Sequence, residues 1–110
     1  MTTDTISDIL AEMASNLEKN LSKSDFKRIG PYAEEIASRH SSRLAWLESM
    51  AKNEKIEKHQ YERALLAERD IYQIELESLA KLSKYKAKKI ARIMSDTLRS
   101  SIFGAVDILL

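Results

Sequence analysis

The chain contains a long stretch without any residue that breaks a helix. From Tyr32 to Phe103 it has no glycine, proline or cysteine; its only proline, Pro31, directly precedes this stretch, and its glycines are Gly30 and Gly104. Glycine in a helix interior costs about 1 kcal/mol and proline about 3 kcal/mol, so their absence over so many residues favours helix throughout. We therefore expect an all-α protein, a bundle of three to four long helices.

Apolar spacing and turn residues divide the chain into expected helices. Apolar residues from Ile6 to Leu21 recur at three- and four-residue spacing, which indicates a first helix. Gly30 predicts a break and Pro31 the start of a second helix, because proline suits the first helical position, where its missing N–H is not needed. Around Ala51 to Lys55 the apolar spacing lapses, so we expect a turn there. Ser83 can cap a last helix, but nothing forces a stop, and the pattern leaves open whether the last two helices are fused.

The length and the C-terminal residues suggest one domain with an apolar tail. A chain of 110 residues has the length of one domain. We expect residues 1–104 to form a helical domain. Residues 105–110 are mostly apolar, although chain ends in soluble proteins are normally polar. We expect this tail either to pack on the helices or to begin a linker or a truncated second domain.

The composition bears on partners and location. Charged residues make up 32% of the chain, but the net charge is only +1, so attraction of the whole molecule to nucleic acid is weak. The absence of cysteine excludes disulfides, a zinc–cysteine cluster and thiol catalysis, and it fits a reducing compartment. The first ten residues do not resemble a signal peptide, and no apolar stretch approaches the roughly 20 residues of a membrane span. We expect an intracellular protein, cytoplasmic in a prokaryote or nuclear in a eukaryote, without a membrane partner.

The sequence contains few residues in the patterns that a metal site or a catalytic site requires. A di-iron site in a helical bundle needs carboxylates on several helices and a Glu-x-x-His pair. His59 and Glu62 stand three apart in the reverse order, and His40 lies in an otherwise apolar stripe. The chain also lacks a glycine-rich phosphate loop and a G-x-S-x-G turn. We expect a protein that is not an enzyme and holds no cofactor or metal.

The segment from Tyr61 to Leu79 carries two neighbouring apolar rows. The first row consists of Tyr61, Leu65, Tyr72, Leu76 and Leu79, and the second of Ala64, Ala67, Ile71 and Ile74. This apolar arc is wider than a two-helix seam requires, so the helix should contact more than one neighbour. A chain of this size with extended helices also leaves apolar surface uncovered. We expect association with copies of the chain or with a paralogue, through this arc and the stripe from Ile90 to Ile102.

A basic segment follows the apolar arc. From Glu54 to Glu77 there are seven acids and four bases, whereas from Lys81 to Arg92 there are six bases and no acid. Lysines around a helix usually solvate it, but such a segment can also neutralise phosphates or face an acidic partner. Only Tyr85 lies among the lysines, so the aromatic platform expected of single-strand binders is missing. The candidate residues for contact with nucleic acid or an acidic partner are Lys84, Lys86, Lys88, Lys89 and Arg92.

The order of these pieces resembles the helical domain of the GINS family, the replication-fork proteins that join the MCM helicase. The resemblance is to the archaeal-type subunit whose helical domain comes first. The acidic-aromatic link of that family looks like Ser24-Asp25-Phe26 here, and its basic-apolar-x-Lys-Ile signature looks like Lys86-Ala87-Lys88-Lys89-Ile90. The resemblance covers roughly Ile6 to Leu98. Two departures are the lysine at Lys86, where the family usually has an arginine that can make bidentate contacts, and the missing β-rich second domain.

The resemblance implies a non-catalytic scaffold. Such a subunit would build a tetramer with itself or a paralogue and bridge the MCM helicase to a RecJ-like or polymerase partner. The residues implied in its core and subunit contacts are Tyr72, Leu76, Leu79, Tyr85, Ile90 and Met94. Two other functions stay open: a coiled-coil adaptor or chaperone of phage or secretion type without a replication role, and a small nucleic-acid-binding protein that uses the basic segment. A strict seven-residue seam would favour the adaptor, and the two-row arc argues against it.

Overall fold

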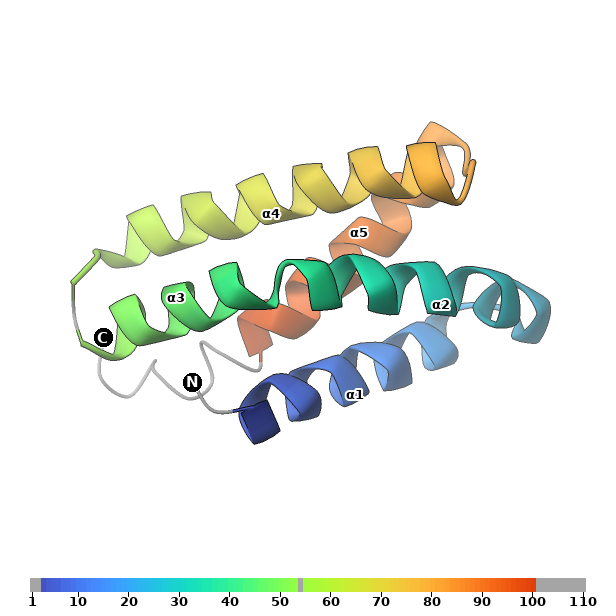
Figure 1. Cartoon of the computed structure of the whole chain (residues 1–110). Helices are drawn as coiled ribbons and strands as arrows, with labels where there is room; N and C mark the ends of the chain where they lie inside the picture. Colours follow the sequence, from blue (N-terminus) through green and yellow to red (C-terminus); the bar gives the residue numbers. More distant parts are fainter. Residues whose placement is uncertain (1–2, 54, 101–110) are drawn as a thin grey trace.

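A computed structural model describes residues 3–53 and 55–100, which form five helices and no strand (Figure 1). The helices are α1 (Thr3–Asn20), α2 (Lys23–Arg39), α3 (Ser41–Lys52), α4 (Lys58–Leu79) and α5 (Lys84–Leu98). The expected all-α class is confirmed. The number of helices exceeds the expected three to four, because α2 and α3 divide at His40 and the last two helices are separate. The expected tail, 105–110, lies outside the described residues.

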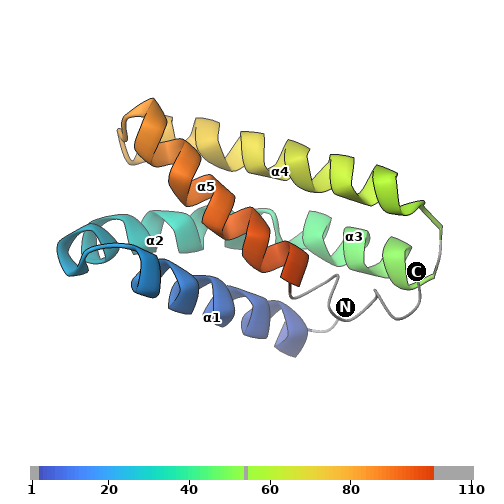
Figure 2. The same cartoon turned by 180° about the vertical axis from the view of Figure 1, so that it is seen from behind.

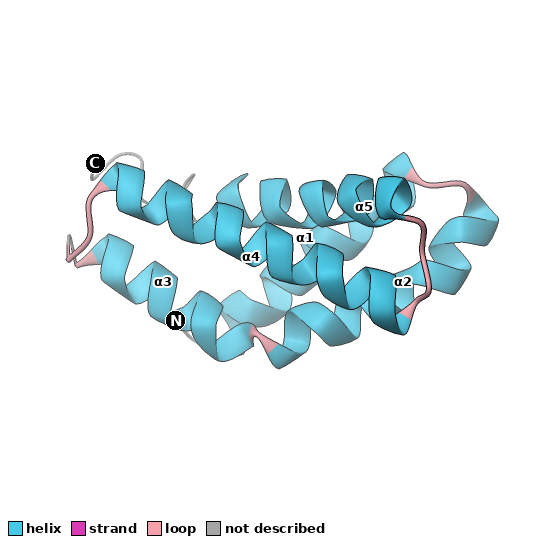
Figure 3. Cartoon of the chain, turned by 90° about the horizontal axis from the view of Figure 1, so that it is seen from above, coloured by secondary structure: helices cyan, strands magenta, loops and turns pink. Residues whose placement is uncertain are grey.

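The helices pack as an oblique bundle. Helices α2 and α3 follow one another nearly in line, between α1 and α4 (Figure 1). Seen from behind, α5 runs diagonally from the end of α4 toward α1, and it packs on both (Figure 2). The view from above shows that short loops connect the helices (Figure 3). The radius of gyration is 13.6 Å, close to the roughly 13 Å of a compact domain of this length, so the chain is not an extended rod.

The core draws on all five helices. Leu47 of α3 is 3% exposed and joins it. A polar contact also links α1 to α5, because the Asn16 side chain donates to the Thr97 hydroxyl at 2.9 Å, and Thr97 donates to the Ile93 carbonyl at 2.8 Å. The largest fully buried side chains are Leu17, Ile29, Ile36, Tyr61, Tyr72, Leu76, Ile90, Met94 and Leu98.

Helix α2 continues through Gly30 and Pro31, so the predicted break at these residues is wrong. Ile29 and Ala33, on either side of the proline, are both 0% exposed, and a break between them would remove one from the core. Burying a side chain as large as isoleucine contributes about 1.5–3 kcal/mol. Burial of Ile29, Ala33 and Ile36 together therefore offsets the roughly 3 kcal/mol that an internal proline costs.

Gly30 allows close packing within the helix and does not form a turn. A Cβ atom at this position would lie 3.3 Å from Cε1 of Phe26, closer than ordinary van der Waals contact. The missing side chain lets the half-buried Phe26 ring lie against the backbone of α2. The glycine that predicts a helix end in the sequence is thus explained by a contact one turn away.

Pro31→Ala is expected to stabilise the protein by about 1–3 kcal/mol, because alanine restores a backbone N–H donor and removes the clash of the proline ring with the preceding turn. Urea unfolding followed by circular dichroism measures the change. Pro31→Gly is the matched control: it restores the same N–H but loses about 1 kcal/mol of helix propensity relative to alanine. Equal stability of Pro31→Ala and the wild type would contradict a continuous α2.

The break between α2 and α3 falls at His40. Its backbone, at φ −100° and ψ 13°, leaves the helical conformation, and α3 begins at the next residue. The sequence has neither glycine nor proline there. The break is therefore not signalled locally, and it coincides with the side-chain contacts to α4 described below.

The loops before and after α4 lie where the sequence predicts or allows them; the sequence left open whether α4 and α5 are fused, and the structure shows two helices. The turn expected around Ala51 to Lys55 is confirmed, because α3 ends at Lys52 and α4 begins at Lys58. Ser83 caps a separate α5: its hydroxyl accepts a hydrogen bond from the Lys86 backbone N–H at 3.2 Å. Lys81, at φ 51°, reverses the chain between α4 and α5.

Candidate functional site

A cluster of charged side chains ties α4 to the junction of α2 and α3. The carboxylate of Glu75 lies 3.2 Å from the Arg39 guanidinium and shares a 2.8 Å hydrogen bond with His40 Nε2. About two turns earlier on α4, Glu68 Oε1 accepts a hydrogen bond from Arg43 Nε at 2.5 Å. These contacts hold both sides of the break against one helix.

The most buried polar groups of this cluster belong to Glu68 and Tyr72. Glu68 is 4% exposed and Tyr72 0% exposed, and neither Glu68 Oε2 nor the Tyr72 hydroxyl has a well-formed hydrogen bond. Burial raises the pKa of the Tyr72 phenol far above its ordinary value, and the charge of the neighbouring Glu68 carboxylate raises it further. Neither residue lines the grooves described below. The cluster is therefore assigned to the fold rather than to ligand binding.

Tyr72→Phe is expected to make the protein less sensitive to alkaline pH. Above about pH 10 the unfolded phenol loses its proton while the folded phenol keeps it, so the folded state binds more protons and stability falls as pH rises. By about pH 11 this contribution amounts to roughly 1.4 kcal/mol, and phenylalanine removes it. Urea unfolding at about pH 8 and about pH 11 measures the difference between variant and wild type.

Tyr85→Phe is the matched control for this prediction. Tyr85 is 79% exposed, so its side chain is surrounded by water in the folded as in the unfolded state. The control should lose the same stability at alkaline pH as the wild type. Equal behaviour of Tyr72→Phe and Tyr85→Phe would contradict the role of burial.

The six residues expected in core and subunit contacts separate into two groups. Leu79 is 43% exposed and Tyr85 79% exposed, so these two lie on the surface. The other four belong to the core of a single chain, and their part in subunit contacts stays a prediction. These four, each at most 1% exposed, are Tyr72, Leu76, Ile90 and Met94.

The second apolar row of α4 remains at the surface. Ile74 is 65% exposed and Ala67 is exposed, while Ala64 and Ile71 are half-buried. The first row, in contrast, is buried from Tyr61 to Leu76. One face of α4 thus completes the core of its own chain, and a second apolar row is left for contact with a partner.

The five candidate basic residues all lie on exposed positions of α5. Lys86 is engaged within the chain, because its Nζ lies 3.3 Å from Oδ2 of Asp25 at the start of α2. Both side chains are partly exposed, at 47% and 29%. Within the described part of the chain, no ion pair involves the other four: Lys84, Lys88, Lys89 and Arg92.

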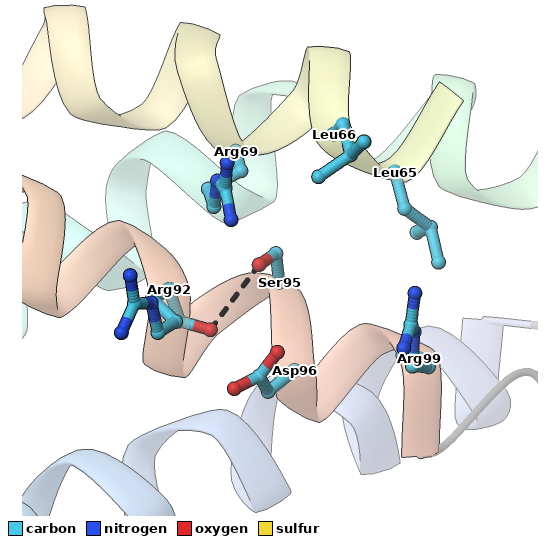
Figure 4. Close-up of a pocket in the computed structure, with 7 residues that line it drawn as sticks. All are labelled: Leu65, Leu66, Arg69, Arg92, Ser95, Asp96 and Arg99. Atoms are coloured by element: carbon cyan, nitrogen blue, oxygen red, sulfur yellow. Dashed lines mark hydrogen bonds between the residues drawn. The ribbon is translucent and has the colours of Figure 1, made fainter. Parts of the chain in front are cut away.

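Two arginines outside the basic segment join Arg92 at a groove between α4 and α5 (Figure 4). Arg69 points into the groove from α4 and Arg99 from α5, with the Ser95 side chain between them (Figure 4). The Ser95 hydroxyl donates to the Arg92 carbonyl at 3.2 Å, and Arg99 lies 3.6 Å from the carboxylate of Glu62. Arg99 follows Arg92 by seven residues and could have been found by extending the helical stripe, whereas Arg69 joins the site only through packing. We call this the α4–α5 groove.

A second groove lies on the other side of Arg92, between the end of α1 and α5. Its lining includes the exposed ring of Tyr85, the half-buried Ile93 and the side chains of Lys88 and Lys89. Asp96 lines both grooves and is the acid among these cations. We call this the α1–α5 groove. Arg92 separates the two grooves and contributes to each.

The described residues offer no other site with recognisable chemistry. Among them no group of three or more His, Asp or Glu side chains is placed to hold a metal ion. His40 pairs with Glu75, and His59 lies 3.1 Å from Glu57 at an exposed position. No helix in the described part of the chain is long and apolar enough to cross a membrane.

The comparisons with known proteins do not indicate a function for this chain. No family model, curated protein or solved structure matches this chain. The exposed second row of α4 and the two cationic grooves beside α5 are therefore the features on which a function can be argued.

Proposed function

We propose that this chain is a non-catalytic scaffold module that binds partner proteins through the second apolar row of α4. The exposure of Ile74, 65% on a helix whose opposite face is buried, carries this proposal. Singly exposed apolar residues are common on monomers, but here Ala67, Ile71 and Ile74 follow one another at four- and three-residue spacing along one helix face. Helix-to-helix recognition uses this spacing of apolar anchors.

The specific form of the proposal is a GINS-type replication scaffold that bridges the MCM helicase to a RecJ-like or polymerase partner. The contact between Asp25 and Lys86 supports it, because it joins the acidic-aromatic link to the basic signature of the last helix, the two segments on which the resemblance rests. The lysine makes a partly exposed contact there rather than a buried bidentate one. Copies of the chain or a paralogous subunit would be the immediate partners of α4.

Light scattering of the purified chain tests the scaffold. We expect a mass above that of the 12.6 kDa monomer, and after addition of an MCM helicase a complex that contains both proteins. Ile74→Asp should return the chain to a monomer with unchanged helical content, because it places a charge in the contact surface without touching the core. Leu66→Asp is the matched control: Leu66 is also exposed on α4, at 47%, but lies outside the second row.

The outcomes separate the alternatives. An oligomer that Ile74→Asp disrupts but that ignores the helicase would support an adaptor or chaperone instead of a replication scaffold. A monomer that binds no protein and binds DNA with steep salt dependence would support the small nucleic-acid-binding protein. A wild-type monomer in every mixture would reject the second row as a contact surface.

A further inference from the structure

Several cations around α5 face solvent without a neutralising partner. Among the residues that the structure describes, Arg69, Lys88, Lys89 and Arg92 take part in no ion pair. The ion pairs made by acids of α4 are those of Glu62 with Arg99, Glu68 with Arg43, and Glu75 with Arg39 and His40. None of these pairs neutralises the four cations beside α5.

The shape of this region fits a chain lying on the surface rather than an enclosed small molecule. The α4–α5 groove holds about 230 Å³ and the α1–α5 groove about 370 Å³, and both are open. Sites that enclose a small organic ligand usually hold about 300–1,000 Å³ and bury most of the ligand; the α4–α5 groove is smaller than this range, and the α1–α5 groove lies within it but is open to solvent. Lys88 and Arg99 are eleven residues apart on one helix, so the cations extend over roughly 16 Å at 1.5 Å per residue.

The grooves combine cations with apolar surface. Leu66, 47% exposed, lines the α4–α5 groove, and Tyr85 and Ile93 line the α1–α5 groove. Guanidinium groups bind carboxylates through paired hydrogen bonds, and apolar side chains bind neighbouring apolar anchors. A ligand that matches both features carries carboxylates and apolar side chains at close spacing.

We infer that the two grooves beside α5 form a docking site for an acidic protein segment with interspersed apolar residues. Nucleic acid fits these observations less well. Tyr85 is the only aromatic residue among the described residues that line the two grooves, so the row of aromatic side chains on which single-stranded bases stack is missing. This site deepens the proposed function, because it names the chemistry of a second partner at grooves that Ile74 does not line.

The test uses a fluorescent peptide of about 16 residues, built of glutamate with leucine at three- and four-residue spacing. Fluorescence anisotropy should show saturable binding that weakens as salt is raised from about 0.05 M to about 0.5 M. The same peptide with lysine in place of glutamate should not bind. A single-stranded oligothymidylate of about 16 nucleotides probes the nucleic-acid alternative.

Arg69→Glu and Arg92→Glu should each weaken peptide binding about tenfold or more, because each reverses a charge in the α4–α5 groove. Arg63→Glu is the matched control on α4: Arg63 is exposed, lines neither groove and undergoes the same charge reversal. Lys88→Glu, at an exposed position of α5, provides a second groove variant that leaves the core untouched. Circular dichroism confirms that each variant is folded.

Three results would overturn the inference: no binding of the acidic peptide, an equal loss of binding in Arg63→Glu and Arg69→Glu, or tighter binding of the oligothymidylate that the same groove variants remove. Ile74→Asp should bind the peptide like the wild type. A failure of the scaffold proposal would appear in light scattering of Ile74→Asp, and a failure of this site in peptide binding, so the two are distinguishable.

Discussion

Leu76→Asp is expected to unfold the protein rather than to separate subunits. Leu76 is 0% exposed in the core of a single chain. The substitution removes a buried apolar side chain and places a carboxylate among apolar neighbours, which together cost about 4 kcal/mol or more. A domain of this size has a total stability of only about 5–15 kcal/mol, so most or all of the cooperative urea transition should be lost.

Ile74→Asp, two residues earlier on α4, is the matched control for stability. Ile74 is 65% exposed in the single chain, so at protein concentrations where the chain is a monomer the same aspartate remains in water and should change the free energy of unfolding by about 0.5 kcal/mol or less. Circular dichroism during urea unfolding compares the two variants. A folded, stable Leu76→Asp with a lower solution mass would contradict the core position of Leu76 and restore it to the subunit interface.

Arg43→Met is expected to destabilise the protein by about 2–4 kcal/mol. Arg43 Nε is the hydrogen-bond donor to Glu68, a residue that is 4% exposed. Removing the cation leaves a buried carboxylate without its partner, and this penalty exceeds the value of the ion pair itself. The half-exposed position of Arg43, at 46%, lets water reach part of the site, so the loss lies below the largest values known for buried pairs.

The double variant Arg43→Met with Glu68→Leu tests whether Arg43 stabilises the protein through its ion pair with Glu68 or through the packing of its side chain. It removes both charges, so its stability should return to within about 1 kcal/mol of the wild type. Arg39→Met is the control for a more exposed pair: the Glu75 side chain is 22% exposed, against 5% for Glu68, and it keeps His40 as a partner, so the loss should stay near 0–1 kcal/mol. A double variant as unstable as Arg43→Met alone would show that the arginine acts through packing.

Much of the architecture follows from local sequence signals. The absence of helix breakers after Pro31 predicts the helical class, and the lapse of apolar spacing near Asn53 predicts the loop before α4. Ser83 can cap a separate α5, because a serine hydroxyl can accept a backbone N–H within the next turn, but the sequence alone leaves open whether α4 and α5 are fused. These signals act over one or two turns of helix, so they can be found without knowing what the segment packs against.

The boundary between α2 and α3 could not be predicted in this way. Gly30 and Pro31 are strong local signals, yet burial of Ile29 and Ala33 on either side keeps the helix intact. At His40 the sequence has no breaker, and the break coincides with ion pairs to Glu68 and Glu75, which lie far along the chain. Long-range packing overrides local propensity at both positions.

The candidate surfaces, like the helix boundaries, depend partly on local sequence and partly on long-range packing. The sequence by itself determined that α4 has two apolar rows and that α5 is rich in lysine, because both follow from residue type and helical period. Only the tertiary structure decided which row the chain buries, that Lys86 pairs with Asp25, and that Arg69 of α4 joins Arg92 and Arg99. Helical period places residues on a face, but the crossing of helices decides which faces meet, and that depends on the packing of the whole core.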